Sequence, residues 1–350
     1  RAQIDSLDAR MLELLNERAR VVIEVGRVKH STNSAYYVPE REKAVYEKLK
    51  SLNKGPLSDD AVRAIYREII SSSRALEKPT TVAFLGPLHT FSQLAAQRIF
   101  GATAELHPMP AVNDIFTEVE RGRIDYGVVP AESSMGGGVS DTLDRFVGSE
   151  LKIVNELLLH VSQNLLSRSP IDKIAKIYSK EQAFPQCRNW LQANVPQAER
   201  INVSSTAEAA RVAAAEEGAA AIGSVLAAEP YGLEVVAERI EDSPHNYTRF
   251  FAIGRQVVGP SGQDKTSLLI SISNRAGALH HLLIPFAEAG IDLTKIESRP
   301  SRIEAGDYVF SVDLGGHVEE PRLAKALDDI APLCTELKVL GSYPRGEVES

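Results

Sequence analysis

The sequence predicts a multidomain protein with an all-α segment, an α/β segment and a small α+β segment. Three observations support this prediction. The first part carries a long helical repeat, the middle alternates strand-like and helical patterns, and the last part has a βαββαβ pattern. The length of 350 residues suits two or three domains. We expect the domains to span residues 1–78, 81–256 and 265–345.

The first segment is predicted to be helical because the stretch from Ile4 to Lys29 has no proline and repeats apolar residues every seven positions. A helix of about 30 residues is about 45 Å long. Two shorter helices, expected near 40–53 and 59–77, cannot cover that length. We therefore expect a homodimer or higher homo-oligomer whose long helices intertwine. Ser58, followed by two aspartates, is a good helix start.

The middle segment alternates apolar strand-like runs with helical patterns. The runs are TVAFLG, YGVVP, KIYSK, AAIGSV and LEVVAERI, and the helical patterns are SQLAAQRIF, QCRNWLQANV and TAEAARVAAAEEG. This alternation predicts largely parallel sheets, in one domain or in two lobes around a cleft. The stretches EKPTT (77–81) and VVGPSGQ (257–263) are the expected linkers.

The last segment has the strand patterns TSLLISIS, DLTKIES, DYVFSVDL and ELKVLGSY, with helical patterns after the first and third. This is the ferredoxin-like order. Pro285 lies inside the first helical pattern and is expected to kink it.

Composition limits the function classes. The formal charge is −8 and no basic tract stands out, so we expect no nucleic-acid partner, although a local basic pocket for an anion is compatible with this charge. No apolar run is long enough to span a membrane and no signal peptide is evident. The chain starts at Arg1, so we expect upstream residues to be missing. Its two cysteines predict a reducing cytoplasm, and its histidines lack metal-ligand spacing.

Several polar residues fall on helical stripes that should be buried. Arg18 occupies a core position of the heptad, and Lys29 shares its face three turns later. Ser73 and Glu77 continue the apolar stripe of the third predicted helix. Any one of them could be salt-bridged or lie at a fraying end, because charges are rarely fully buried. Together they predict a pocket for an anion.

The stretches RAQIDSLDARMLELLNERARVVIEVGRVK and PEREK (39–43) resemble the first helix and the start of the second helix of the helical chorismate mutases. This reaction is a rearrangement that needs positioning and charge stabilisation but no cofactor. Relatives often carry glutamine in place of Glu77 and aspartate in place of Val38; a glutamate donates only when protonated. The resemblance implies these catalytic residues: Arg1 from the other protomer, Arg18, Lys29 and Arg41 for the carboxylates, Glu42 for the hydroxyl, Ser73 near a carboxylate, and Glu77 with Lys29 at the ether oxygen.

Five blocks, from FLGPLHTFSQLAA to IEDSPHNYTRFFAIG, resemble the prephenate dehydratases. The resemblance implies two α/β lobes around a cleft, similar to periplasmic binding proteins. It also implies conversion of prephenate to phenylpyruvate, with Thr248 donating to the leaving hydroxyl. The implied substrate-binding residues are Thr90, Ser92, Glu132, Ser133, Ser134, Gln186, Asn246, Arg249 and Phe250.

Strand alternation would place Thr248 and Phe250 on one face and Arg249 on the other. Arg249 would then brace the structure or face water, and would reach substrate only from an irregular strand. Some family positions differ, among them Leu88-His89, Ser133 and Gln163. Two alternatives therefore stay open: a weak or arogenate-preferring dehydratase beside an active mutase, or a non-catalytic amino-acid-sensing module in residues 81–345.

The stretches NRAGALHHLL and IESRPSR resemble the two effector-binding blocks of ACT domains in phenylalanine-regulated dehydratases. The resemblance implies feedback inhibition by L-phenylalanine at an interface between ACT domains. Gly277 and Pro300 also fit a simple turn and a strand stop. The implied effector-binding residues are Gly277, Ala278, Leu279, His280, Glu297, Ser298, Arg299 and Pro300. The whole chain is thus predicted to be a bifunctional isomerase and lyase, acting on chorismate and then prephenate.

Overall fold

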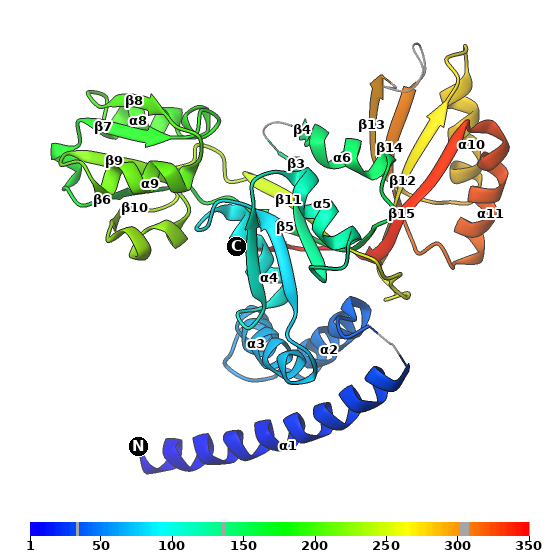
Figure 1. The fold of residues 1–350 in the computed structure, drawn as a ribbon, viewed down its shortest axis with the longest axis horizontal. Coiled ribbons are helices and arrows are strands. Elements are labelled where there is room, and N and C mark those ends of the chain that lie inside the picture. Colours follow the sequence, from blue (N-terminus) through cyan, green and yellow to red (C-terminus); the bar gives the residue numbers. More distant parts are fainter. Residues whose placement is uncertain (33–34, 135–136, 301–307, 350) are drawn as a thin grey trace.

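The computed structural model describes residues 1–32, 35–134, 137–300 and 308–349. Its N-terminal part is all-α, as predicted, with helices α1 (Ala2–Thr32), α2 (Pro39–Leu52) and α3 (Asp59–Glu77) (Figure 1). The predicted start of α3 is confirmed, because the Ser58 hydroxyl accepts a hydrogen bond from the Ala61 backbone N–H at 3.2 Å.

Helix α1 leaves its apolar stripe uncovered. Ile4, Met11 and Leu14 are 61%, 57% and 63% exposed within the single chain. The helix meets α3 near its C-terminal end, where Gly26 lies against the side chain of Glu77. A second apolar surface is therefore needed to bury most of α1.

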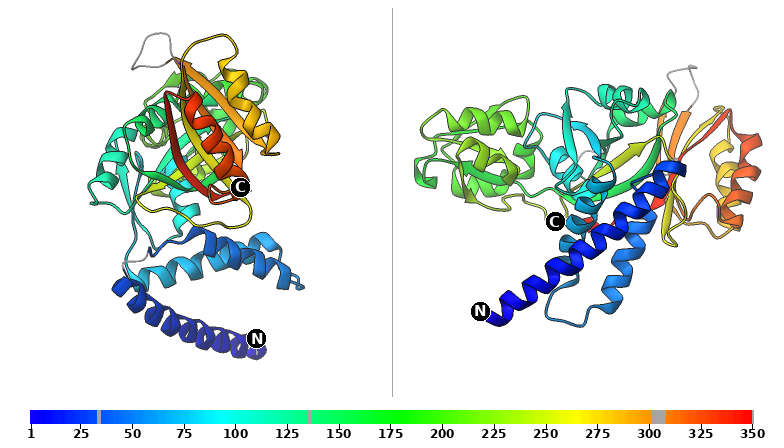
Figure 2. Two further views of the ribbon diagram at one scale, coloured as in Figure 1. Left: turned by 90° about the vertical axis from the view of Figure 1, so that its right-hand side faces the viewer. Right: turned by 60° about the horizontal axis from the view of Figure 1, so that its bottom comes forward.

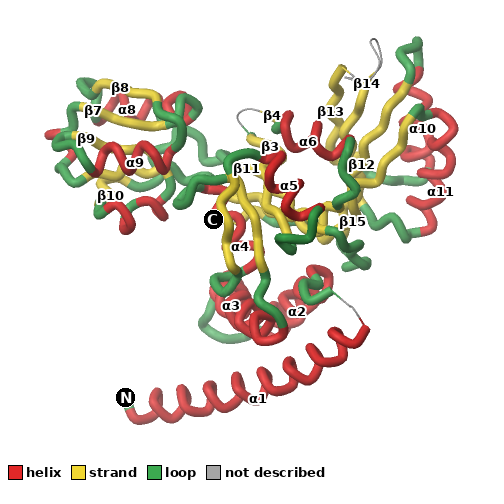
Figure 3. Tube along the Cα trace, viewed as in Figure 1, coloured by secondary structure: helices red, strands yellow, loops and turns green. Residues whose placement is uncertain are grey.

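The middle part consists of two lobes of strands and helices, joined by loops (Figure 3). Lobe 1 has one sheet in the order β16–β5–β11–β3–β1–β2, with β4 paired to β3. Its strands are β1 (Thr81–Leu85), β2 (Glu105–Met109), β3 (Tyr126–Ser133), β4 (Gly137–Gly138), β5 (Lys152–His160), β11 (Tyr247–Gly254) and β16 (Val348–Glu349). Its helices are α4 (Phe91–Phe100), α5 (Val112–Glu120) and α6 (Ser140–Val147).

Lobe 2 has a sheet in the order β10–β6–β9–β7–β8. Its strands are β6 (Asn164–Ser167), β7 (Lys176–Ser179), β8 (Glu199–Asn202), β9 (Ala219–Gly223) and β10 (Glu234–Ala237). Its helices are α7 (Ala183–Gln186), α8 (Arg188–Asn194) and α9 (Thr206–Ala214), with short 3₁₀ turns at Ile171–Lys173, Val225–Ala227 and Glu229–Tyr231. The two-lobed α/β prediction is confirmed.

The prediction of largely parallel sheets was wrong. Strand β11 is antiparallel to both β3 and β5, and β6 is antiparallel to both β9 and β10. The chain leaves lobe 1 after β5 and returns to it as β11, so these two neighbouring strands run in opposite directions. The two crossing segments lie side by side, with the Val161 N–H donating to the Asn246 carbonyl at 2.8 Å.

The C-terminal part confirms the ferredoxin-like prediction. Strands β12 (Asp264–Ile272), β13 (Leu293–Pro300), β14 (Tyr308–Gly315) and β15 (Glu336–Pro344) form an antiparallel sheet in the order β13–β14–β12–β15. Helices α10 (Ala278–Glu288) and α11 (Pro321–Ile330), with a 3₁₀ turn at Ala331–Leu333, cover one face of that sheet (Figure 2). Helix α10 continues through Pro285 to its end.

The C-terminal sheet is packed directly on lobe 1. Strand β15 crosses β5 so closely that a Cβ on Gly341 would lie 2.3 Å from the Ile153 carbonyl oxygen. Leu340 and Tyr343 of β15 belong to the same apolar core as Ile153 and Phe251. Glycine is required at this crossing, and the C-terminal part and lobe 1 share a core. Across the described residues, no helix is both long and apolar enough to cross a membrane.

Candidate active sites

A polar cluster joins α1 to α3, at the positions where the apolar stripes carry charged residues. Arg18 Nη1 donates to the Ser73 hydroxyl, and Ser73 is buried. Lys29 Nζ lies 3.2 Å from Glu77 Oε2. The cluster therefore presents two cations, a hydroxyl and a carboxylate on one helix–helix surface.

Glu42 extends this cluster from α2. Arg74 Nη1 donates to Glu42 Oε1 at 2.6 Å, and the Arg74 guanidinium stacks on the ring of Tyr37 at 4.9 Å. Burial raises the pKa of Glu42 above its usual value, and the charges of Arg74 and Lys29 only partly offset that effect. Glu42 consequently keeps a proton to a higher pH than an exposed glutamate does.

Two predicted residues lie apart from this cluster within one chain. Arg1 directly precedes α1 and lies 28 residues before Lys29. At 1.5 Å per residue, that is a separation of about 42 Å. Arg41 is exposed in the first turn of α2. An intact site that uses Arg1 would therefore need the α1 of another copy.

A second cluster lies where the two crossing segments connect the lobes. Gln186 Oε1 accepts hydrogen bonds from Gln163 Nε2 at 2.9 Å and from Asn246 Nδ2 at 3.1 Å. Asn246 Nδ2 also donates to the Val161 carbonyl at 3.0 Å. Sequence reasoning noted Gln163 only as a departure from the family pattern. Gln163 is 4% exposed and lies in this cluster. Its difference from the family pattern was therefore the one sequence signal that marked this position.

Thr248 lies beside this amide cluster, two residues after Asn246. In the sheet it pairs with Ser133 of β3 and Leu159 of β5. Ser134 is held beside the start of β11 by two hydrogen bonds to Tyr247. Its N–H donates to the Tyr247 carbonyl at 3.0 Å, and its hydroxyl accepts from the Tyr247 N–H at 3.1 Å. Hydroxyl groups from two adjacent strands therefore meet near the lobe junction.

Thr90 and Ser92 start α4, immediately after the loop that follows β1. Strands β1 and β3 are parallel, so this loop and Ser133 lie at the same edge of the sheet. The loop also reaches lobe 2, since the His89 ring meets the Tyr231 ring edge-on at a centroid distance of 5.7 Å. Thr90 uses its hydroxyl to hold the loop, donating to the Pro87 carbonyl at 3.0 Å.

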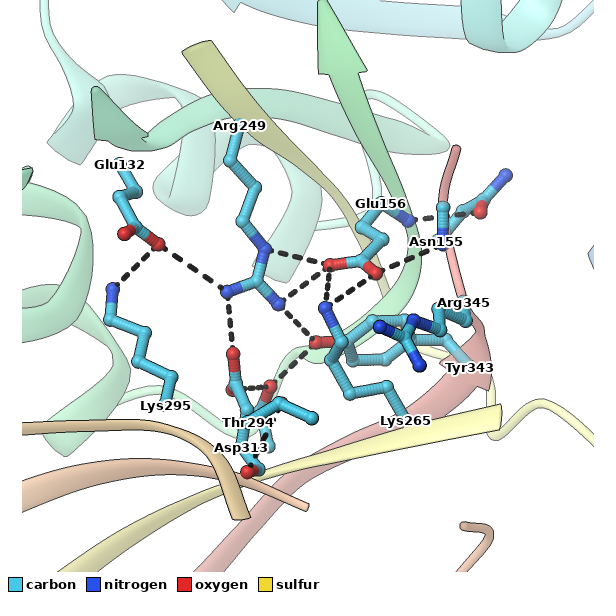
Figure 4. A network of polar contacts seen from close by, with 12 residues as sticks. Glu132, Asn155, Glu156, Arg249, Lys265, Thr294, Lys295, Asp313, Tyr343 and Arg345 are labelled. Carbon is cyan, nitrogen blue, oxygen red and sulfur yellow. Dashed lines mark hydrogen bonds and ion pairs between the residues drawn. The ribbon is translucent and has the colours of Figure 1, made fainter. Parts of the chain in front are cut away.

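The structure corrects the predicted substrate-binding roles of Arg249 and Phe250. Arg249 is 4% exposed and points toward Glu156 and Asp313, in the interface with the C-terminal part (Figure 4). Its Nη1 lies 2.5 Å from Asp313 Oδ2 and its Nη2 lies 2.6 Å from Glu156 Oε2. Phe250 is 2% exposed and packs in the apolar core of lobe 1. Strand alternation sends the two side chains to opposite faces, and both faces are covered.

Glu132 also has a partner outside its own lobe. Its Oε2 lies 2.9 Å from Lys295 Nζ, on β13, and 3.7 Å from Arg249 Nη1. Lys295 and Arg249 compensate this carboxylate in the single chain.

The two predicted effector blocks lie at the same end of the C-terminal sheet. Ile272, which precedes the first block, and Pro300, which ends the second, both pair with Tyr308. Gly277 has a φ of +80° and precedes the first turn of α10, a conformation that glycine adopts readily. Ala278 and Leu279 pack on the domain core, and His280 is exposed.

The second block carries a compensated carboxylate. Arg299 Nη2 lies 2.7 Å from Glu297 Oε1, and Lys295 Nζ lies 3.3 Å from Glu297 Oε2. Burial alone would raise the pKa of Glu297, but the Arg299 hydrogen bond and the Lys295 charge hold it below its usual value. Ser298 is exposed; the side chain of Pro300 and residues 301–307 lie outside the described part.

Known protein families match three successive parts of the chain, and full-length relatives match it over almost its whole length. It matches chorismate mutase type II over residues 1–78, prephenate dehydratase over 82–257 and the ACT domain over 266–332. A bifunctional chorismate mutase/prephenate dehydratase of Stutzerimonas stutzeri is 47% identical over 352 residues, which cover 99% of this chain and 96% of the relative. Another, from Aquifex aeolicus, is 45% identical over 350 residues, covering 99% and 97%.

A solved structure covers the dehydratase and ACT parts. It is the prephenate dehydratase from Arthrobacter aurescens in complex with L-Phe, which is 36% identical, has a TM-score of 0.70, and covers 76% of this chain and 90% of that chain. Together with the two polar clusters and the full-length relatives, these similarities show that the chain belongs to the bifunctional chorismate mutase/prephenate dehydratase family.

Proposed function

We propose that this chain catalyses two consecutive reactions, from chorismate to prephenate in the helical part and from prephenate to phenylpyruvate in the two-lobed part. The observation that carries the proposal is that one chain holds both polar clusters, one on α1 and α3 and one at the lobe junction. We assign the domains to residues 1–78, 81–256 and 265–345, and we place the enzyme in the cytoplasm.

The mutase cluster suits a unimolecular rearrangement. Arg18 and Lys29 would bind the substrate carboxylates, which fixes the reactive conformer. Lys29 would donate toward the ether oxygen, where negative charge develops as its bond to carbon breaks, and Glu77 would do so only in its protonated form. Glu42 would accept a hydrogen bond from the substrate hydroxyl. Ser73, which accepts from Arg18, would hold that guanidinium in place.

The dehydratase cluster suits the loss of a carboxylate and a hydroxyl from one ring. As carbon dioxide leaves, the electrons of the broken carbon–carbon bond pass through the ring and expel the hydroxyl, which becomes water once protonated. Thr248 would donate a hydrogen bond to that leaving oxygen, because a threonine hydroxyl is too weak an acid to give up its proton fully. Ser133, Gln186 and Asn246 would supply further polar contacts beside it.

We propose that L-phenylalanine inhibits the dehydratase by binding at the two effector blocks of the ACT domain. The relative from Arthrobacter aurescens that was solved with L-Phe supports this ligand. The backbone at Gly277 and the carboxylate of Glu297 would receive the two charged groups of the amino acid. Strand β13 is at the edge of its sheet, where a strand of a second ACT domain would pair.

We further propose that the mutase site is completed by a second copy of the chain. The exposed stripe of α1 and the distance of about 42 Å between Arg1 and Lys29 support this arrangement. Mixing Arg1→Ala and Lys29→Met subunits tests it. Mutase activity should return to about a quarter of the wild-type value in an equal, fully exchanged mixture, since half of the dimers would be mixed and would hold one intact site of two. A mixture as inactive as its components would exclude a site that shares Arg1.

The experiment for the two activities uses the purified protein with chorismate and, separately, with prephenate, while phenylpyruvate is measured with and without phenylalanine. Phenylpyruvate from both substrates is expected. If prephenate accumulates from chorismate and no phenylpyruvate forms, the chain has mutase activity without dehydratase activity. A parallel incubation with arogenate, in which phenylalanine is the product measured, identifies the preferred substrate by its higher rate. No turnover of prephenate or arogenate would indicate a sensing module.

A further inference from the structure

Lys295 stands between two carboxylates that belong to different functional regions. Its Nζ lies 2.9 Å from Glu132 of the dehydratase and 3.3 Å from Glu297 of the second effector block. The three side chains are 18%, 33% and 25% exposed, so water screens them only in part. One ammonium group therefore bridges two carboxylates across a domain interface, with Arg299 as the second partner of Glu297 at 2.7 Å.

The contact joins one strand, β13, to the β3–β4 strand pair. Lys295 and Glu297 are two residues apart on β13 and share a face. Glu132 and Gly138 are opposite each other in the β3–β4 pair. The Glu297 carboxylate occupies the space of a side chain at position 138, because a Cβ on Gly138 would lie 2.3 Å from its Oε2. The effector strand is thus seated on the hairpin that follows β3.

That hairpin is directly connected to the proposed catalytic residue. Glu132 is followed by Ser133, and these two residues pair with Arg249 and Thr248 of β11. Glu132 Oε2 also lies 3.7 Å from Arg249 Nη1, whose stronger partner is Asp313 of the ACT sheet (Figure 4). A change in the charge around Glu132 would therefore act on the strand pair that carries Thr248.

We propose that Lys295 is the positioning residue that couples the effector block to the dehydratase site. Without effector it is shared between Glu132 and Glu297, and it holds the β3–β4 hairpin beside Thr248. The ammonium of an amino-acid effector competes for Glu297, so Lys295 shifts toward Glu132 and displaces the hairpin. This inference rests on the proposed inhibition by phenylalanine and names the contact through which it acts. Where phenylalanine weakens prephenate binding, prephenate must weaken phenylalanine binding by the same factor, because coupling between binding free energies is reciprocal.

The test compares Lys295→Met with Lys338→Met in the full-length protein. Lys338 is a matched control, because it also joins the ACT sheet to lobe 1, donating to the Val147 carbonyl at 3.2 Å, and is 15% exposed. Phenylalanine binding is measured by calorimetry, and dehydratase kcat and KM are measured with and without saturating phenylalanine. Mutase activity of the same samples reports correct folding of the N-terminal part.

Lys295→Met should still bind phenylalanine, while the inhibition factor falls at least about ten-fold, as expected when a typical coupling is lost. Its kcat without effector should also fall several-fold, with mutase activity unchanged. Lys338→Met should match the wild type in all of these measurements. Lys295→Arg, which keeps the charge, should restore most of the inhibition, and adding Lys295→Met to Glu132→Gln should change inhibition no further.

Three results would overturn the inference. If Lys295→Met binds phenylalanine and is inhibited to the same extent as the wild type, Lys295 takes no part in the coupling. The proposed regulation by phenylalanine would then still stand. An equal loss of inhibition in Lys338→Met would mean that the interface is merely loosened. A wild-type protein that does not bind phenylalanine would refute the regulation itself and the coupling with it.

Discussion

Replacing Arg249 with methionine should strongly destabilise the unit formed by lobe 1 and the ACT domain. The guanidinium is 4% exposed and lies 2.6 Å from Glu156 and 2.5 Å from Asp313. Glu156 would keep Lys265 at 2.8 Å, but Asp313 would keep only the Ser267 hydroxyl at 2.5 Å. The substitution therefore leaves one buried carboxylate without a cation.

Removing one partner of a buried ion pair typically costs about 3–5 kcal/mol. For a unit of this size, each kcal/mol lowers the melting temperature by about 2–4 °C, so we expect a decrease of roughly 6–20 °C. Asp313→Leu in the same chain should recover part of the loss, because the uncompensated carboxylate is then gone.

Differential scanning calorimetry of the full chain measures this change. Arg211→Met is the control, since Arg211 pairs with Glu208 on the surface, is 60% exposed, and should leave the transition unchanged. A melting temperature for Arg249→Met no lower than that of the control would show that the buried ion pairs of Arg249 do not stabilise the folded protein. Recovery by the double variant separates a lost ion pair from a lost packing contact.

Three further substitutions test other parts of the structure. Glu77→Gln should keep or broaden the pH range of mutase activity, because glutamine donates at every pH and glutamate only when protonated; complete loss of activity would reject the role of Glu77. Arg74→Gln should raise the pKa of Glu42 further, because the positive charge that lowers this pKa is removed. Mutase activity needs the ionised carboxylate, so the acidic limb of its pH profile should move to higher pH. Movement of that limb to lower pH would contradict the assignment. Gly341→Ala should destabilise the protein by about 1–3 kcal/mol in urea titrations, since its Cβ would overlap the Ile153 carbonyl; an unchanged midpoint would show that β15 can move away.

Much of the fold could be predicted because its signals are local. The start of α3 depends on a serine hydroxyl three residues from its donor, and the βαββαβ pattern depends on periodicities within single segments. Strand β5, with the sequence KIVNELLLH, was not identified, because Asn155 and the buried charge of Glu156 interrupt its apolar residues.

The role of Arg249 could not be predicted for a related reason. Its partners Glu156 and Asp313 lie 93 and 64 residues away in the sequence, and one of them belongs to another domain. Alternation predicts that Arg249 and Thr248 lie on opposite faces of the strand, but only the packed ACT sheet shows what Arg249 faces. The same applies to Glu132, whose partner Lys295 lies 163 residues later.

Thr248→Ala separates the two consecutive reactions that one chain carries. The variant is given chorismate at neutral pH, and prephenate and phenylpyruvate are followed together by nuclear magnetic resonance, with an enzyme-free control for spontaneous loss. We predict that chorismate disappears at the wild-type rate and that prephenate accumulates, with phenylpyruvate formation reduced at least about a hundred-fold. Phenylpyruvate formed at the wild-type rate would show that Thr248 does not assist the loss of the hydroxyl.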